Sequence, residues 1–275
     1  MGAPPSLPLL TQAARPSTFE ITAINEKGEA LPVSIAGEYP LTLFLDGHEI
    51  ATLMTLGTCP EALALGYLRN QQLVSDIGQI ASVHVDWDQH AVTVATRDGR
   101  SGNLVRLSQR SGTVASGIGT LMDRLMHGLE SIRLPSDAHL DSGRLFALAR
   151  QVRQLQTIHE KAGAVHGCAL ARIDAQRVDV LMFLEDVGRH NATDAVAGRM
   201  WLDGLDGADK VLFTTGRMTS GIVLKAAIMG IPFLISRNGI THAGWQIARQ
   251  AGVTAIGRVQ GQHYLVYTGA ERFCR

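Results

Sequence analysis

The chain has 275 residues, of which 45% are hydrophobic, and its 25 basic and 25 acidic side chains give a formal net charge of zero. This composition predicts a folded protein of one large or two ordinary domains, and the balanced charge favours neither nucleic acid nor an anionic membrane surface as a partner. No stretch of about 20 apolar residues is present that would cross a bilayer. The three cysteines, Cys59, Cys168 and Cys274, form no disulfide framework and no metal motif, so we expect a cytoplasmic protein without a metal site.

The first half of the chain is predicted to be rich in β-strands. Residues 1–17 contain four prolines and no signal-peptide pattern, so we expect a disordered arm. Within residues 18–135, short segments of period-two hydrophobicity alternate with turn residues, which is typical of a β-rich domain. The expected strands are 19–24, 41–45, 82–87 and 91–96. One helix is expected to begin at Pro60, because proline is favoured in the first turn of a helix.

Two features mark the end of this first domain. Residues 110–120 are rich in glycine and serine, so we expect a mobile loop there, followed by a short helix at about 122–129. After Pro135 the pattern changes to alternating helices and strands, and the first helix, at about 141–162, opens on an Asp-Ser capping signal. We therefore expect a second domain over residues 136–275.

The second domain is predicted to be an α/β structure of three layers. Its expected strands are 167–173, 178–184, 210–214, 232–236, 254–258 and 263–268, the last of them at an edge of the sheet. Its expected helices lie at about 192–202, 220–229 and 243–252. This alternation predicts a largely parallel sheet covered by helices on both faces.

Polar clusters stand at the ends of the predicted strands. They are His166 and the runs 186–191, 214–220 and 236–241. Strand ends at one edge of an α/β sheet face a common crevice, so we expect these clusters to converge on one ligand, with Asn191 near the cap of a helix. Arg217 and Arg237 suit a phosphorylated ligand, because a guanidinium pairs with phosphate oxygens in bidentate fashion. The alternative is an ordinary turn with surface arginines and a salt bridge between Asp186 and Arg189.

Two cysteines have surroundings that bear on reactivity. Cys168 lies two residues after His166 in a predicted strand, hence on the same face, where an imidazole could help to form a thiolate. The alternative is an inert thiol in the core of the sheet. Cys59 precedes Pro60 at a helix start, where backbone N–H groups could lower its pKa.

Several short motifs are spread over most of the chain. They are Ala164-Val165-His166, the run 185–191 with Asp194, and Thr215-Gly216-Arg217 followed by Lys225. Together they resemble the FdhD-type formate dehydrogenase accessory proteins, which are sulfur carriers for the molybdenum cofactor. The resemblance implies a second domain similar to the cytidine deaminase fold without its zinc site. It also implies a homodimer.

The same resemblance implies a ligand and the residues that hold it. The ligand is bis-molybdopterin guanine dinucleotide with molybdenum or tungsten, which a GDP-like nucleotide is expected to mimic. The implied cofactor-binding residues are His166, Asp186, Gly188, Arg189, His190, Asn191, Gly216, Arg217, Ser236, Arg237, Arg258, Val259, Gln260, Gly261, Gln262 and His263.

The chain departs from the resembled family at one informative place. Sulfur carriers of that family have a mobile loop with a Cys-Gly-x-Cys-Gly type motif, whereas the corresponding run here is Ala-Ser-Gly-Ile-Gly-Thr at 115–120. Ser116 and Gly119 stand at the two cysteine positions. A serine hydroxyl cannot hold a transferable sulfane sulfur, because persulfide exchange requires a thiolate and a sulfur leaving group. Whether the chain acts as a sulfurtransferase is therefore open, and Cys168 is the remaining thiol candidate.

Three functions remain in competition at this point. The first is an accessory protein that binds the cofactor and delivers it to the catalytic subunit of a formate dehydrogenase, with a cysteine desulfurase as a further partner. The second is a nucleotide-processing enzyme in which His190 or His166 acts as general base and Asp186 orients it. The third is a non-catalytic partner protein of the dehydrogenase.

Overall fold

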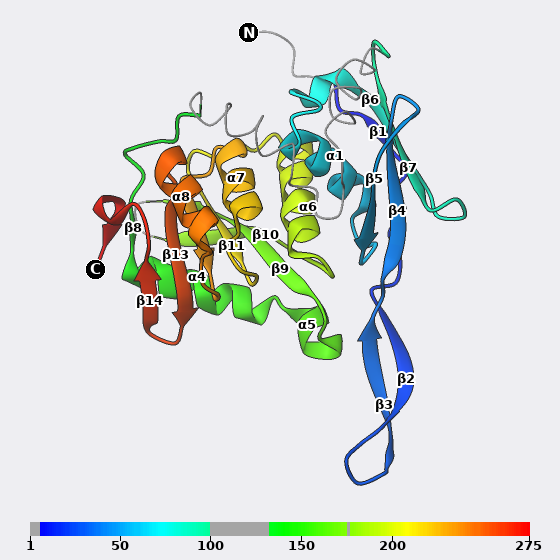
Figure 1. The fold of residues 1–275 in the computed structure, drawn as a ribbon, viewed down its shortest axis with the longest axis horizontal. Coiled ribbons are helices and arrows are strands. Elements are labelled where there is room, and N and C mark those ends of the chain that lie inside the picture. Colours follow the sequence, from blue (N-terminus) through cyan, green and yellow to red (C-terminus); the bar gives the residue numbers. More distant parts are fainter. Residues whose placement is uncertain (1–5, 100–131, 175–176) are drawn as a thin grey trace.

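The structure is a computed structural model that describes residues 6–99, 132–174 and 177–275. It consists of a β-rich N-terminal lobe and an α/β C-terminal lobe that lie side by side (Figure 1). The expected loop 110–120 and the expected helix at 122–129 lie outside the described residues. Among the helices that are described, none is long and apolar enough to cross a membrane.

The N-terminal lobe is built on a five-stranded sheet with one helix against it. The strand order is β1-β6-β7-β4-β5, and the bounds are β1 Leu9–Leu10, β4 Tyr39–Leu45, β5 His48–Thr55, β6 Ile80–Asp86 and β7 Ala91–Thr96. Alternate residues of β4, such as Leu41 and Leu43, point into the core and pack against helix α1 (Pro60–Asn70). A short 3₁₀ helix, Ile77–Gln79, precedes β6. The period-two pattern and the proline at the helix start thus predicted β4, β6, β7 and α1 correctly, whereas β1, β5 and the 3₁₀ helix were not expected.

Residues 6–17 do not form the disordered arm that their prolines suggested. Strand β1 pairs in parallel with β6, with Leu9 opposite Ser82. The Trp87 indole N–H donates to the carbonyl oxygen of Ala13 at 2.6 Å. The Thr11 hydroxyl donates to the Val83 carbonyl oxygen and accepts the Val85 N–H, both in β6. Strand β1 pairs with a strand about 70 residues later in the chain, and such pairing leaves no signal in the local composition. The prediction of disorder for residues 6–17 was therefore wrong.

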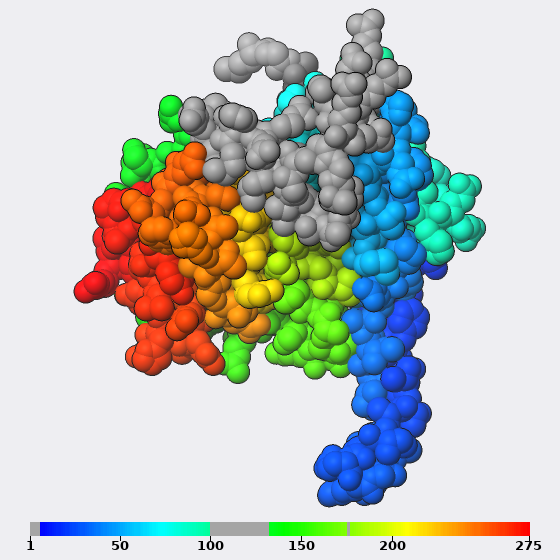
Figure 2. Space-filling model, in the orientation of Figure 1, coloured from blue at the N-terminus to red at the C-terminus, as the bar shows by residue number. Residues whose placement is uncertain are grey.

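A two-stranded hairpin projects from the base of this lobe. Its strands are β2 (Thr18–Ile24) and β3 (Ala30–Ala36), which pair in antiparallel register. The hairpin stands away from the body of the molecule as a separate arm (Figure 2). We refer to residues 18–36 as the β-arm.

The C-terminal lobe contains a six-stranded sheet of order β10-β9-β11-β12-β13-β14. The strands are β9 His166–Ile173, β10 Val178–Asp186, β11 Lys210–Thr214, β12 Phe233–Ser236, β13 Thr254–Gln260 and β14 His263–Val266. The final strand lies at the edge, as expected. The expectation of a largely parallel sheet is wrong, because only the pairs β11–β12 and β12–β13 are parallel. Only residues 174–177 separate β9 from β10, which is far fewer than the crossover of a parallel pair requires.

Helices cover both faces of this sheet and complete three layers (Figure 1). On one face lie α6 (Arg189–Leu202), α7 (Ser220–Ile228) and α8 (His242–Ala251). On the other face lies α4 (Ser142–Gln154), followed by α5 (Thr157–Ala162). Alternate residues of β9 serve the two faces, so that Cys168 packs toward α6 and Ala169 toward α4. The C-terminal segment adds a short 3₁₀ helix, Ala270–Arg272, and strand β15 (Phe273–Cys274), which pairs with β8 (Leu140–Asp141).

The helix expected over 141–162 is interrupted. Helix α4 ends at Gln154, with Leu155 as its C-cap, and helix α5 begins at Thr157. The expected capping signal is present, since the Asp141 carboxylate accepts the Arg144 backbone N–H at 2.8 Å. The interruption turns α5 toward the end of β10, where it meets the polar cluster described below.

Helices α1 and α6 join the two lobes in very close contact. A Cβ added to Gly66 would lie 1.7 Å from the carbonyl oxygen of Asp194, and one added to Gly198 would lie 1.9 Å from that of Ala62. Only glycine permits backbones to approach this closely. The crossing fixes the position of α6, whose first turn carries the polar cluster at 189–191.

Candidate functional site

The predicted polar clusters meet at one edge of the C-terminal sheet. His166 pairs with Asp186 across β9 and β10, and Thr214 pairs with Cys168 on one side and with Ser236 on the other. The start of β9 therefore lies beside the ends of β10, β11 and β12. We call this the near edge of the sheet. The convergence that the sequence predicted is confirmed for the clusters at 166, 186–191, 214–217 and 236–238.

Asp186 is the organising residue of the near edge. Its Oδ2 accepts the Thr55 hydroxyl at 2.6 Å and the Leu56 N–H at 3.1 Å, and its Oδ1 accepts the Gly188 N–H and the Asn191 amide, both at 3.0 Å. Burial raises the pKa of Asp186, and the four donors oppose that shift. All four oxygen lone-pair positions are thus used within the protein. Asp186 thus connects the two lobes. It does not form a salt bridge with Arg189, which was the alternative interpretation of this turn.

Helix α6 begins at Arg189, about one turn before the expected start at residue 192. Gly188 occupies the N-cap, and Asn191 lies within the first turn, where its amide donates to the Met54 carbonyl oxygen at 2.6 Å. The expectation that Asn191 caps this helix is wrong, because its amide is engaged with the N-terminal lobe and with Asp186. A Cβ on Gly188 would lie 3.2 Å from Asn191, so glycine leaves room for this contact.

Glu185 holds helix α5 against the near edge. Its two carboxylate oxygens accept the N–H groups of Ile158 and His159, each at 3.0 Å. A carboxylate at a helix start satisfies free backbone donors and interacts favourably with the helix dipole. The run 185–186 is therefore a scaffold that brings α5 and the N-terminal lobe to the strand ends.

Arginine side chains give the near edge its positive charge. Arg189 lies across Gly216, whose added Cβ would be 2.9 Å from the Arg189 side chain, and the Arg189 Nε is buried without a hydrogen-bond partner. Burial lowers the pKa of Arg189, and the positive charge of the exposed Arg217 lowers it further. Within residues 6–99, 132–174 and 177–275, neither guanidinium forms an ion pair. Two adjacent cations without a carboxylate partner among the described residues are a chemical arrangement that suits an anion.

The two histidines of the near edge are driven toward the neutral form. Burial lowers the pKa of His166, and the charges of Arg189, His159 and Arg217 add to the effect. Burial also lowers the pKa of His190 to about 3, with Lys225 and Arg189 as further causes. Burial is the larger cause of each shift, and the neighbouring positive charges add to it. Neither histidine is among the four donors to Asp186, so the base-and-orienter pair of the nucleotide-enzyme hypothesis is not formed.

The loops after β11 and β12 are held to each other by their own polar groups. The Ser236 hydroxyl donates to the Gly216 carbonyl oxygen at 2.6 Å, and the Asn238 amide donates to the Thr215 carbonyl oxygen at 2.7 Å. Ser236 is completely buried. Its role is therefore to shape the turn that carries Arg217, whereas the sequence had placed it in contact with a ligand.

A cavity of about 700 Å³ adjoins the near edge on the α4 side of the sheet. It is lined by Phe146, Ala149, Arg150, Arg153, Arg237, Asn238, Val259, Gln260, Gly261 and Gln262. Burial lowers the pKa of Arg237, and the charge of Arg153 adds to the effect. Arg150 and Arg153 were not predicted from the sequence as site residues. They lie in the C-terminal half of helix α4, outside the strand ends, and only the fold brings them to Arg237.

The last predicted segment, 258–263, lies partly in this cavity. Val259 packs into the core below it, while Gln260, Gly261 and Gln262 form its rim. Arg258 and His263 are exposed, and the Arg258 backbone N–H donates to the Asn238 carbonyl oxygen at 3.0 Å. The segment thus adjoins the loop of Arg237, as a common ligand would require.

Behind the near edge lies a buried polar cluster between the lobes. The Lys225 ammonium is 2.6 Å from Asp194 Oδ2, and the Asn70 amide donates to Asp194 Oδ1 at 2.7 Å. Burial raises the pKa of Tyr67 to about 12, and the Asp194 carboxylate contributes. These contacts hold α1, α6 and α7 together, although the Asn70 side-chain oxygen is buried without a hydrogen-bond partner. They are too deep to meet a ligand at the strand ends.

The cysteines offer no activated thiol. Cys168 is completely buried, its Sγ lies 3.8 Å from the Thr193 hydroxyl, and burial raises its pKa to about 12. Burial also raises the pKa of Cys59, so the expected lowering at the helix start is wrong. Cys274 is exposed on β15. Ser116 and Gly119 lie outside the described residues, and the described residues contain no group of three metal-ligating side chains.

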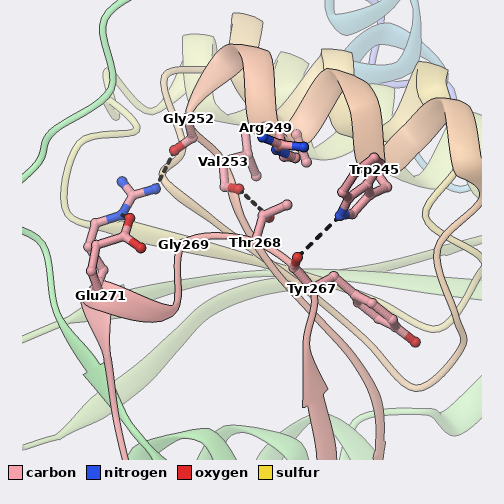
Figure 3. Close-up of a pocket in the computed structure, with 10 residues that line it drawn as sticks. Trp245, Arg249, Gly252, Val253, Tyr267, Thr268, Gly269 and Glu271 are labelled. Atoms are coloured by element: carbon pink, nitrogen blue, oxygen red, sulfur yellow. Dashed lines mark hydrogen bonds and ion pairs between the residues drawn. The ribbon is translucent and has the colours of Figure 1, made fainter.

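A second cavity, of about 340 Å³, lies between helix α8 and the C-terminal segment (Figure 3). Its polar groups bond to one another: the Trp245 indole N–H donates to the Tyr267 carbonyl oxygen at 3.3 Å, and the Thr268 hydroxyl donates to that of Val253 at 2.7 Å. Arg272 donates to the Gly252 carbonyl oxygen. These hydrogen bonds use the polar groups around the cavity to hold the C-terminal segment against helix α8, so we do not interpret the cavity as a ligand site.

Comparisons with known proteins agree over nearly the whole chain. Residues 36–274 match the model of the FdhD/NarQ family. A protein named sulfur carrier protein FdhD from Listeria innocua is 28% identical over 241 residues, which cover 87% of this chain and 91% of that protein. A protein of the same name from Bacillus subtilis is 29% identical over 275 residues and covers 92% and 98% of the two chains.

One solved structure extends the agreement to the fold. It is described as a formate dehydrogenase accessory protein from Desulfotalea psychrophila, and it superposes with a TM-score of 0.74 at 25% identity. The superposition covers 94% of this chain and 100% of the other. The mixed α/β architecture is thus shared, while the likeness to cytidine deaminase stays a prediction.

Proposed function

This chain belongs to the FdhD/NarQ family, and on that premise we propose that it is an accessory protein for the maturation of a formate dehydrogenase. In this proposal it binds bis-molybdopterin guanine dinucleotide in the cytoplasm and delivers it to the catalytic subunit. The observation that carries the proposal is the set of arginines at the near edge that have no carboxylate partner among the described residues. The related proteins named as sulfur carriers and as an accessory protein support it.

The residues present suit the chemical groups of this cofactor. A dinucleotide cofactor carries pyrophosphates, which guanidinium groups bind through paired hydrogen bonds. Arg189 and Arg217 offer such groups on the α6 side, and Arg150, Arg153 and Arg237 offer them in the cavity on the α4 side. The ligand would bring a dithiolene-bound molybdenum or tungsten centre, and the protein would hold the nucleotide ends.

Cofactor delivery, rather than sulfur carriage, is the role that this chain's own residues favour. A carried sulfur requires an accessible thiolate. Cys168 is buried with a raised pKa, and Ser116 and Gly119 replace the cysteines of the carrier motif. We propose the dehydrogenase catalytic subunit as the main partner, a cysteine desulfurase as a partner that the family role implies, and a second copy of this chain.

The cofactor proposal is tested by what the protein carries when it is purified. After anaerobic purification, the bound pterin and guanine nucleotide are released and quantified by mass spectrometry. We expect both in the wild type, a loss of at least about tenfold in Arg217→Ala, and no loss in the matched variant Arg177→Ala at the opposite edge of the sheet. Absence of the cofactor from wild-type protein made in cells that synthesise it contradicts the proposal.

The sulfur question needs a separate experiment. The protein is incubated with a cysteine desulfurase and cysteine, and its intact mass is measured for the wild type and for Cys168→Ala. We expect no added sulfur in either protein. An added sulfur that disappears in the variant would restore a sulfurtransferase with a relocated carrier.

A further inference from the structure

Helix α5 is a short element without a buried residue. It has six residues, and none of them is buried. Its start is attached to the end of β10, because the Glu185 carboxylate accepts the N–H groups of Ile158 and His159. A helix of this length is not stable on its own in water. The position of α5 therefore depends on the groups that it touches.

Irregular backbone flanks α5 on both sides. Before the helix, Gln156 has a φ of −79° and a ψ of 59°, which belong to neither a helix nor a strand. After it, Gly163 has a φ of 62° and a ψ of −156°, and Ala164 has a φ of 53°. The first of these two conformations is essentially restricted to glycine, and the second is uncommon for a residue with a Cβ. Element-terminal residues absorb the backbone change when an element moves as a unit, so α5 lies between two hinge positions.

One side of α5 meets the near edge. Besides the contact with Glu185, the His159 side chain lies near the arginines of this edge. Burial lowers the pKa of His166 most, and the charges of Arg189, His159 and Arg217 add to the effect. A protonated His159 is therefore repelled by its surroundings in this structure. An anion bound beside the arginines would reverse the sign of that interaction and would hold α5 against the edge.

The other side of α5 meets the β-arm. Helix α5 packs against β3, and the Lys161 ammonium lies 3.4 Å from the Thr18 hydroxyl at the start of β2 (Figure 1). A two-stranded ribbon is marginally stable by itself in water, so the base of the β-arm gains order from the element that packs on it. Helix α5 thus touches the near edge and the β-arm at the same time.

We propose that α5 is a hinged strap that couples the near edge to the β-arm. An anion at the near edge and an ordered arm base both favour the docked position of α5. The anion in this coupling is the cofactor of the proposed function, on which the ligand part of the inference rests. Coupling between two sites is reciprocal, so a contact that orders the arm base would also tighten binding of the anion. The arm base is therefore more ordered in the loaded protein than in the empty one.

Hydrogen exchange of the full chain, measured by mass spectrometry, tests the strap without any ligand. The variant Glu185→Gln keeps the size of the side chain and removes the charge that holds the start of α5. We expect the amides of α5 and of the arm base, residues 18–20 and 34–36, to exchange about tenfold faster. The turn at the arm tip, residues 25–29, should be unchanged, because Asn25 holds it by local hydrogen bonds. The control Glu160→Gln removes an exposed carboxylate from α5 and should change neither segment.

A second variant displaces α5 from its other end. In Gly163→Ala the new Cβ meets no atom within 4 Å, but alanine strongly disfavours the backbone conformation of this position. This variant should speed exchange in α5 and the arm base in the same pattern as Glu185→Gln. The matched control is Gly204→Ala after α6, which also has a positive φ and open space around its Cβ. Variants that leave α5 unchanged, or that loosen α5 and leave the arm base unchanged, would overturn the proposal.

GDP tests the ligand side of the coupling. Saturating GDP should slow exchange in α5 and the arm base of the wild type by at least about fivefold, and this slowing should be lost in Glu185→Gln. GDP that binds in a calorimetric titration without slowing either segment would contradict the coupling. If GDP does not bind at all, the proposed function fails, whereas the two α5 variants still decide whether the strap links the near edge to the β-arm.

Discussion

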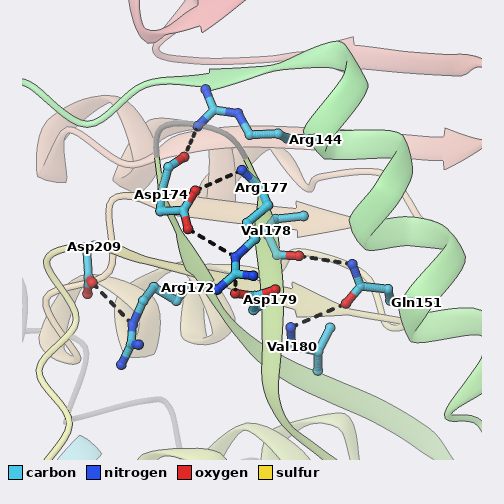
Figure 4. A network of polar contacts seen from close by, with 9 residues as sticks. All are labelled: Arg144, Gln151, Arg172, Asp174, Arg177, Val178, Asp179, Val180 and Asp209. Atoms are coloured by element: carbon cyan, nitrogen blue, oxygen red, sulfur yellow. Dashed lines mark hydrogen bonds and ion pairs between the residues drawn. The ribbon is translucent and has the colours of Figure 1, made fainter.

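The two edges of the C-terminal sheet carry arginines in opposite circumstances. At the far edge, where β9 ends and β10 begins, each arginine has an acidic neighbour (Figure 4). Arg177 lies 3.2 Å from Asp174 and 2.9 Å from Asp179, and Arg172 lies 3.5 Å from Asp209. At the near edge, Arg189 and Arg217 face each other's charge, and among the described residues neither has a carboxylate partner.

The difference shows which arginines are available to a ligand. Exposed ion pairs such as those of the far edge contribute little to stability and neutralise the surface. Neighbouring cations without partners cost free energy, because like charges repel and a partly buried guanidinium loses hydration. An anionic ligand offsets that cost. The near edge is therefore the place where binding energy is available, and four measurements test this difference between the two edges.

The largest effect is expected from Gly66→Ala, which disrupts the scaffold of the near edge. The new Cβ would lie 1.7 Å from the Asp194 carbonyl oxygen, so α1 and α6 must separate. We expect a loss of about 3–5 kcal/mol in the free energy of unfolding, measured by urea denaturation. The control is Gly143→Ala in α4, where the nearest atom is the movable Asp141 carboxylate at 3.2 Å, and a loss below about 1 kcal/mol is expected. Equal losses in the two variants would contradict the close crossing.

The next effect concerns the thiol behind the near edge. Because Cys168 is buried and Cys274 is exposed, iodoacetamide should modify Cys168 at least about 100-fold more slowly in the native protein. Peptide mass spectrometry over time measures both rates, and unfolding in urea should abolish the difference. Rapid modification of Cys168 in the native protein would contradict its burial and would make it a possible sulfur carrier again.

A smaller effect is expected from the pH dependence of stability. The pKa of His190 is about 3 in the folded protein, against 6.5 as its ordinary value. Between these two pKa values the unfolded chain binds a proton at His190 and the folded chain does not. The free energy of unfolding is therefore unaffected by His190 above pH 6.5 and decreases as pH falls from 6.5 toward 3. Between pH 7 and pH 5 the wild type should lose about 1–2 kcal/mol more than His190→Gln. The exposed His263→Gln serves as control, and an identical loss in all three proteins would contradict the assigned cause.

The smallest effect is expected at the far edge. Arg177→Ala removes two exposed ion pairs, and the free energy of unfolding should change by less than about 0.5 kcal/mol. Thermal unfolding at low and high salt measures it. A loss above about 1.5 kcal/mol would mean that the far edge is a cooperative network, and the contrast between the edges would weaken.

Local signals in the sequence predicted most of the fold. Strand β4 was visible in its alternation, α1 in its proline start, and α4 in its Asp141 cap. The antiparallel pairing of β9 with β10 and the ordering of residues 6–17 were missed, because both depend on which distant strands pair. Register and pairing follow from tertiary packing rather than from local periodicity.

The convergence of the polar clusters was predicted, but the contacts that their individual side chains make were not. The clusters after the strands do converge, because strand ends at one edge are neighbours in any such sheet. Asp186 and Ser236 look like ligand groups in the sequence, yet their oxygens serve internal hydrogen bonds. Arg150 and Arg153 look like surface charges of a helix, yet they line the cavity. Sequence spacing alone cannot tell a polar group that is satisfied inside the protein from one that is free.

The central claim is that the unpartnered arginines of the near edge bind the nucleotide part of an anionic cofactor. Isothermal titration with GDP tests it most directly, using the wild type, the double variant Arg189→Ala with Arg217→Ala, and the far-edge variant Arg172→Ala with Arg177→Ala. The account predicts saturable binding to the wild type and the far-edge variant, and binding weaker by about 10- to 100-fold in the near-edge variant. Equal GDP affinity in all three proteins, or no binding to the wild type, would contradict it.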